Sequence, residues 1–147
     1  MILLTSFAVA LAAATSAPLA VHHLTLPHSS GTAEAEYRGE IGVQHRQVGS
    51  AAPAGRPSTL RCLWTATMKV NRTATTAAGA LASRSFVQGD IANGSRPGWC
   101  SANRSVMARD VALRLGDGRR HLVKAADADR AVLVADVGRL APAAVRN

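Results

Sequence analysis

The most regular pattern in the chain is a strict alternation of apolar and polar residues between Leu60 and Asn71. One side holds Leu60, Cys62, Trp64, Ala66, Met68 and Val70, and the other side is mainly Thr, Arg, Lys and Asn. A period of two is typical of a β-strand that buries one face. We therefore predict a strand here, with Cys62 and Trp64 pointing into the core.

A second alternating segment covers residues 33–48, where Ala35, Tyr37, Gly39, Ile41 and Val43 share one side. It predicts a half-buried strand, in which Gly39 and Gly42 mark a bulge or a close approach of another backbone segment. Residues 80–87 predict a third strand, although neither of its sides is clearly apolar. The connections between these strands are too short for helical crossovers, so we expect an antiparallel meander.

Apolar residues with helical spacing follow a turn segment that ends at Cys100. They predict a helix that Ser101 caps and that stops at residues 116–118, which are Gly-Asp-Gly. Residues 119–140 also fit a buried strand, because their apolar run is short, but we favour a second helix. The predicted fold class is α+β: a small three-stranded antiparallel β-meander packed against one or two C-terminal α-helices.

The N-terminal segment, residues 1–17, is an apolar run that fades into small residues, as signal peptides do. We expect cleavage between residues 14 and 20 and export to a bacterial periplasm or the extracellular space. No Lys or Arg precedes the run, and a single anchor helix or a buried first helix is the alternative. Only this segment, if uncleaved, would reach a membrane. We expect a flexible segment at 18–32, a single α+β domain at 33–140 and a disordered tail at 141–147.

The sequence contains two cysteines, Cys62 and Cys100, and we predict that they form a disulfide bond. Such a bond would tie the start of the helix to the buried face of the strongest strand. Their separation is unlike the close Cys-x-x-Cys spacing of a redox pair. The alternative is a nucleophilic Cys100 at a helix N-terminus, with His121 as its base.

The chain is basic and poor in aromatic residues. It has 17 Lys and Arg against 9 Asp and Glu, a formal net charge of +8, and 3% aromatic residues. This charge suits an anionic component of the cell envelope. The arginines are spread along the chain, and a preference for Ala and Arg fits a bacterium with a GC-rich genome. Because aromatic platforms for bases are scarce, we do not expect specific nucleic-acid binding.

Few residues form a recognisable site. Trp99 and Arg96 lie in a turn segment and are a candidate binding surface, although we favour a Trp99 that packs against the disulfide bond and Trp64 as the centre of a small core. His22, His23 and His28 are weak candidates for metal ligands, because clustered histidines in a flexible segment are usually solvated. We predict no catalytic residue and no cofactor.

These observations predict a non-catalytic exported domain with a binding or structural role. One alternative is a small envelope hydrolase or thiol enzyme that uses Cys100 and His121. Another alternative is docking on anionic lipid or polysaccharide.

Overall fold

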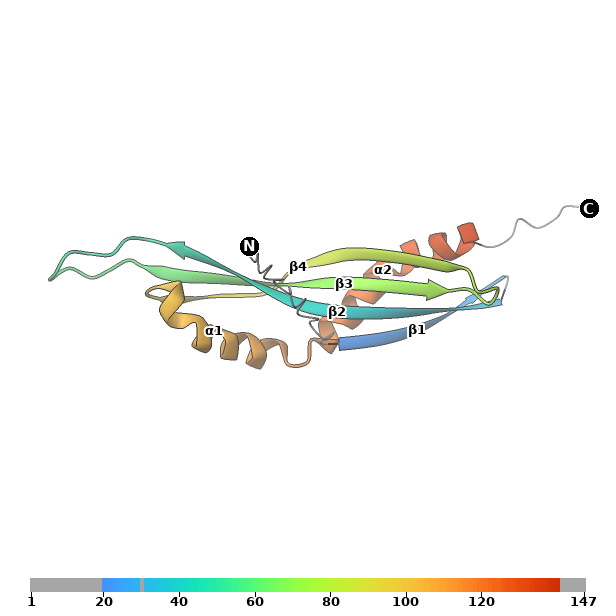
Figure 1. Cartoon of the computed structure of the whole chain (residues 1–147), viewed down its shortest axis with the longest axis horizontal. Coiled ribbons are helices and arrows are strands. Elements are labelled where there is room, and N and C mark those ends of the chain that lie inside the picture. Colours follow the sequence, from blue (N-terminus) through green and yellow to red (C-terminus); the bar gives the residue numbers. More distant parts are fainter. Residues whose placement is uncertain (1–19, 30, 141–147) are drawn as a thin grey trace, which may run out of the picture.

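The computed structural model describes residues 20–29 and 31–140. It shows an α+β fold in which a four-stranded antiparallel sheet precedes two helices (Figure 1). The strands lie side by side in chain order, as expected of a meander. The elements are β1 (Ala20–His28), β2 (Gly31–Val48), β3 (Arg61–Thr75), β4 (Leu81–Pro97), α1 (Cys100–Leu115) and α2 (Arg119–Leu140). The α+β class, the antiparallel sheet and the C-terminal helices are confirmed, and the prediction of three strands is wrong.

The additional strand is β1, which lies in the segment for which we predicted no regular structure. It pairs with β2 from Ala20 opposite Gly39 to His28 opposite Gly31. Ala20 and Leu26 are buried, so one side of β1 does face the core. The sequence does not show this alternation clearly, because a polar residue, His22, occupies a core-facing position. Pro27 also argues against a strand, since proline is uncommon within strands. An edge strand tolerates such a proline, because one side of its backbone needs no partner.

The two strands with the clearest alternation have the predicted faces. Tyr37, Cys62 and Trp64 are all at most 2% exposed. The prediction for Gly39 is wrong, because the β2–β3 register is regular there and no other described backbone segment lies close. Gly39 instead makes room for side chains, since a Cβ atom there would lie 3.1 Å from Met68 Sδ. Alternation thus predicted both the elements and the side of the sheet that carries the core.

The last strand, β4, is longer than predicted and includes residues 94–97, which we read as a turn. An irregularity divides it, since Ala66 pairs with Ala92 but Met68 pairs with Gln88. Residues 89–91 therefore lie opposite Thr67 alone, and Asp90 adopts a φ of 45°. Such a bulge shifts the alternation along the strand, which is why the sequence pattern breaks there.

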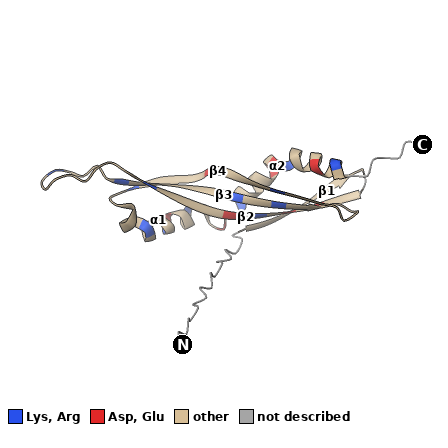
Figure 2. Ribbon diagram, turned by 45° about the horizontal axis from the view of Figure 1, so that its top comes forward, with Lys and Arg blue, Asp and Glu red and all other residues tan. Residues whose placement is uncertain are grey.

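Both helices pack on the same face of the sheet, because the β3 residues in their two core clusters all alternate to one side. They lie along different halves of the twisted sheet (Figures 1 and 2). α2 packs over β1, β2 and β3 through residues that include Leu122, Leu133 and Val137. α1 packs over the other half of the sheet through Met107 and Val111. Residues 119–140 are helical, as we favoured, and the Gly-Asp-Gly segment separates the two helices. The opposite face of the sheet is covered by no described element.

The predicted disulfide bond between Cys62 and Cys100 is present, with a Cα–Cα distance of 4.8 Å. It joins β3 to the first residue of α1. The predicted cap is wrong, because Trp99 is the N-cap residue and its side chain makes no capping hydrogen bond. Instead, Gln47 Oε1 accepts a hydrogen bond of 2.8 Å from the Cys100 backbone N–H. A side chain of β2 therefore accepts a hydrogen bond from one of the backbone N–H groups that lack a partner within the helix.

Candidate functional site

β2 continues well past the start of β1. Ala20, the first residue of β1, pairs with Gly39, whereas β2 continues to Val48 along β3. Within the described part of the chain, residues 40–48 therefore have a strand neighbour on one side only. We term their other side the free edge of β2. Its backbone groups are available for pairing with a further strand.

A groove of about 300 Å³ runs between the free edge and α1; we term it the edge groove. Its walls are mainly apolar, and its lining residues are Ile41, Val43, His45, Arg104, Ala108, Val111, Ala112, Leu115 and Gly116. The groove exists because α1 sits over Trp64 and Ala66 of β3, which leaves part of β2 uncovered. Ile41 and Val43 are consequently only half-buried although they point toward the helix layer.

The edge groove has polar side chains at one end. Gln47 contacts the first residue of α1, so the start of the helix lies beside the far end of β2. His45 on β2 and Arg104 in the first turns of α1 both belong to this end. Among the ion pairs of residues 20–29 and 31–140, none involves Arg104. Its guanidinium thus provides a positive charge that no described carboxylate compensates.

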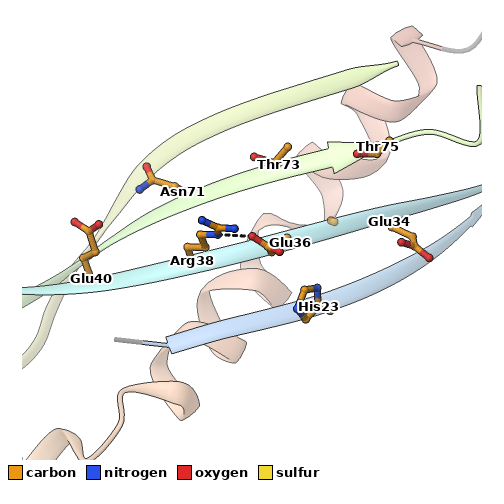
Figure 3. A pocket seen from close by; sticks show the side chains of 9 residues that line it. His23, Glu34, Glu36, Arg38, Glu40, Asn71, Thr73 and Thr75 are labelled. Atoms are coloured by element: carbon orange, nitrogen blue, oxygen red, sulfur yellow. Dashed lines mark hydrogen bonds and ion pairs between the residues drawn. The ribbon is translucent and has the colours of Figure 1, made fainter. Parts of the chain in front are cut away.

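A wider hollow of about 730 Å³ lies on the uncovered face of the sheet (Figure 3). Side chains of β1, β2 and β3 line it, including His23, Glu34, Glu40 and Asn71. Arg38 and Glu36 form an ion pair across its floor. The hollow is open to solvent and no described Phe, Tyr or Trp side chain lines it, so it lacks the large aromatic platforms on which rings of a ligand commonly stack. We assign it no chemistry.

Buried charges connect the sheet to α2. Asp129 accepts hydrogen bonds from Arg72 Nη1 at 2.7 Å, Arg84 Nη1 at 2.5 Å and Tyr37 Oη at 3.2 Å. The second terminal nitrogen of Arg72 binds Asp136, which lies about two turns further along the same face of α2. The side chains of Arg72 and Asp129 are 0% and 2% exposed. Arg72 and Asp129 are therefore closed off from solvent, whereas the Arg84 side chain is 38% exposed. The ion pairs of this network hold α2 against β3 and β4.

The surroundings of this network shift the pKa values of Tyr37 and Asp136. Burial, followed by the charge of Asp129, raises the pKa of Tyr37 to about 12. The hydrogen bond from Arg72 is the main reason why the pKa of Asp136 lies below its usual value. The Tyr37 phenol therefore stays protonated throughout the physiological pH range.

The structure places Cys100 and His121, the two residues of the alternative enzyme hypothesis, far apart. Cys100 is in the disulfide bond, and no described cysteine is free. His121 is in the first turn of α2, and its Nε2 atom is buried without a hydrogen-bond partner among the described residues. Cys100 and His121 are separated by the whole of α1, whose 16 residues span roughly 24 Å.

Trp99 and Arg96, the candidate binding surface, lie on either side of the β4–α1 junction. Trp99 is 55% exposed, so our expectation that it packs into the core is wrong. Arg96 makes a two-pronged ion pair with Asp110, with distances of 2.9 and 2.8 Å from Nε and Nη2. The buried tryptophan is Trp64, and the Arg114 guanidinium lies 5.2 Å from its ring centre.

The three histidines of β1 do not converge. His22 and His23 are neighbours in a strand and therefore point to opposite faces of the sheet. His22 lies beside the ring of Tyr37, at 6.4 Å between centroids, and His23 lines the uncovered face. His28 is six residues beyond His22, roughly 20 Å along the strand. Within the described ranges, no group of three or more His, Cys, Asp and Glu side chains is arranged to hold a metal ion.

Sequence reasoning missed both the buried network and the edge groove. Arg72 continues the core-facing positions of β3 after Val70, and this placement was the available signal that it is buried. Asp129 and Asp136 are spaced by seven residues and share a helix face with buried apolar residues. The edge groove had no comparable signal, because it depends on where β1 begins and how α1 lies across the sheet.

The expected signal peptide at residues 1–17 and the expected tail at residues 141–147 lie outside the described residues. No described helix is long and apolar enough to cross a membrane. Searches of protein-family models, curated proteins and solved structures found no match to this chain.

Proposed function

We propose that this protein is an exported, non-catalytic binding domain that takes up an extended polypeptide segment along the free edge of β2. The observation that carries this proposal is the juxtaposition of an unpaired strand edge with an apolar groove. A bound strand can pair its backbone with β2 while alternate side chains enter the groove. Strand addition of this kind combines backbone hydrogen bonds with side-chain specificity.

The dimensions of the edge groove suit a short extended segment. Ile41 and His45 are four residues apart on β2, which corresponds to roughly 13 Å. Arg104 and Leu115 are eleven residues apart on α1, which corresponds to roughly 16 Å. A segment of about four to five extended residues covers this length. Two or three of its side chains would point toward the helix layer.

Export is supported by the disulfide bond, because such bonds persist mainly outside the reducing cytosol. The apolar residues 1–17 are the sequence feature that would direct it. The proposal places the domain in a bacterial periplasm or outside the cell. Detection of the disulfide-linked chain in a periplasmic or secreted fraction tests this part of the proposal, and recovery of all chains in the cytosol contradicts it.

A non-catalytic role is favoured because the strongly interacting acids and bases of the core are enclosed by the sheet and α2. The alternative, a small envelope hydrolase or thiol enzyme, requires Cys100 as a free thiolate beside His121. Intact-mass measurement under non-reducing conditions separates the two. A mass lower than that of the reduced chain by two hydrogen atoms supports the binding role, and two alkylatable thiols support the enzyme.

Selection from a phage-displayed library of random nonapeptides tests binding at the edge groove. Ala108 lines the groove from α1, and an Ala108→Arg substitution would fill its mouth without lowering helix propensity. Ala102→Arg on the exposed side of the same helix is the matched control. We expect selected peptides to have apolar residues at alternate positions and to lose at least about ten-fold in affinity with Ala108→Arg only. Equal binding by both variants would contradict the proposal.

A second candidate function is docking on anionic lipid or polysaccharide through the β2–β3 hairpin. The hairpin extends beyond α1 (Figure 1), and residues 41–89 contain no Asp or Glu. Arg46, Arg56 and Arg61 lie in its distal part. Each basic residue near an anionic lipid surface contributes about 1 kcal/mol. We expect salt-sensitive sedimentation with phosphatidylglycerol vesicles that a triple Arg→Gln variant loses; binding that is insensitive to salt would contradict this candidate.

A further inference from the structure

We infer that the polypeptide bound at the edge groove carries a carboxylate at the end that lies beside His45 and Arg104. The inference rests on the proposed function and adds the chemistry and the polarity of the partner. It concerns a segment with alternating apolar residues that ends in, or is followed by, an acidic group.

The edge groove has two chemically different ends. Leu115 and Ile41 form one end, at the close of α1 and next to the point where β1 begins. The other end lies at the start of α1, which the hydrogen bond between Gln47 and the Cys100 backbone holds beside β2. Only this second end offers polar groups, from His45 and Arg104. A bound segment must therefore be apolar along the groove and polar at one end.

The charge at this end is positive and uncompensated. No carboxylate lines the edge groove. Asp110, the acidic residue of α1, is already bound by Arg96 on the β4 side of the helix. The nearest part of the sheet adds no negative charge, because residues 41–89 lack Asp and Glu. A carboxylate is the protein group that best matches an unpaired guanidinium, because the two can form charge-assisted hydrogen bonds.

A second copy of this chain fits the groove less well than an acidic partner. Two chains with a formal net charge of +8 repel one another. A symmetric pairing of two free edges would also bring the cationic ends of both grooves to one interface. The segment that precedes β1 is a further possible occupant, but residues 1–19 contain no Asp or Glu. Neither of these occupants would place a carboxylate beside Arg104. If either one is the natural occupant, we expect the groove to show no preference for acidic peptides.

The carboxylate has two possible sources, an Asp or Glu side chain or the C-terminus of the partner. Fluorescein-labelled peptides with a central Leu-Thr-Leu-Thr-Leu sequence distinguish them. One set carries Glu before or after this core and an amidated C-terminus. Another set carries Gln at both places, with either a free or an amidated C-terminus. A Lys set reverses the charge. Fluorescence anisotropy with the full disulfide-bonded domain measures each dissociation constant.

We expect one Glu peptide, or the neutral peptide with a free C-terminus, to bind about five-fold more tightly than the neutral amidated peptide. Arg104→Glu should abolish this preference and favour the Lys peptides. Arg109→Glu, on the same helix but outside the groove, changes the net charge equally and should preserve the preference. Near-ultraviolet circular dichroism of both variants verifies that the fold is retained.

Three results would overturn the inference. The first is equal affinity for acidic and neutral peptides, which leaves the proposed function intact and indicates a different occupant. The second is an acidic preference that Arg104→Glu and Arg109→Glu reduce equally, which assigns it to the overall charge. The third is absence of binding by every peptide, including the neutral ones, which overturns the proposed function as well.

Discussion

Arg72 and Asp129 face each other between the sheet and α2, with 2.7 Å between Nη1 and Oδ2 and almost no exposure of either side chain. A charge pair in this position is expensive to break, because removal of one partner leaves the other buried with one of its two opposite charges missing. The pair also joins β3 to α2 across a separation of 57 residues. It therefore sets how α2 lies on the sheet, and the packing of the larger core cluster depends on it.

Neutralising Asp129 should strongly destabilise the fold. We expect Asp129→Asn to lower the free energy of unfolding by about 3 kcal/mol, because Arg72 and Arg84 both lose their shared carboxylate. Urea unfolding followed by circular dichroism measures this difference. Asp127→Asn, on the exposed side of the same helix, is the control and should change stability by less than about 0.5 kcal/mol. Equal effects of the two substitutions would mean that the buried pair is not formed.

Tyr37 should ionise only at very alkaline pH. Its pKa is raised to about 12 by burial and by Asp129, whereas an unfolded tyrosine titrates near 10. The folded state therefore retains a proton that the unfolded state loses, so stability is full below pH about 10 and falls as the pH rises from there to about 12. Tyr37 is the one tyrosine in the sequence, and its tyrosinate absorbance reports this titration directly. A midpoint near 10 in the folded protein would contradict the buried contact with Asp129.

Asp136 should contribute to acid sensitivity. Its pKa is lowered mainly by the hydrogen bond from Arg72, so the folded state holds its charge to lower pH than the unfolded state does. The resulting stability is present above the ordinary aspartate pKa of about 4 and is lost as the pH falls through the lower folded value. Unfolding curves of the wild type and Asp136→Asn between neutral and strongly acidic pH test this. The difference between them should shrink toward acid, and a constant difference would contradict the shift.

The alternation of residues predicted β2 and β3 and their buried faces, because local spacing encodes these features. The disulfide bond followed from a different signal, the presence of two cysteines in a chain with an export-like N-terminus. The alternation failed at β1, where His22 faces the helix layer in place of an apolar residue. It also failed in β4, where the bulge at residues 89–91 shifts the period and Gly94 looks like a turn residue. In both strands the sheet partner, rather than the local sequence, determines the structure.

The edge groove could not be predicted from local patterns either, because it depends on contacts between parts of the chain that are distant in sequence. Ile41 and Val43 follow the same alternation as Tyr37, and nothing in their spacing shows that α1 leaves them partly uncovered. The groove depends on the difference in length between β1 and β2 and on the position of α1. That position follows from contacts such as the one between Gln47 and Cys100, which are distant in sequence. Only the assembled fold brings these determinants together.

The disulfide bond should be the largest single contributor to stability outside the core. Replacing both cysteines by alanine removes a cross-link between residues separated by 38 positions. A chain-entropy model predicts a loss of about 4 kcal/mol in the free energy of unfolding. Denaturant unfolding of the Cys62→Ala/Cys100→Ala variant measures it, with the reduced wild type as the matched control. A loss below about 1 kcal/mol in both would show that Gln47 and the helix packing hold α1 in place without the bond.

Gly94 should tolerate no larger residue, because it supports the ring of Trp64. A Cβ atom at position 94 would lie 2.7 Å from Trp64 Cε2, which is closer than such atoms approach in proteins. Trp64 is 2% exposed and packed, so the ring has little room to shift. We expect Gly94→Ala to lower the free energy of unfolding by about 1 to 3 kcal/mol. Gly89→Ala in the same strand is the control, since a Cβ atom there meets nothing within 4 Å. Thermal and urea unfolding of the two variants distinguishes them, and a Gly94→Ala protein as stable as the wild type would show that Trp64 does not pack on β4 at this position.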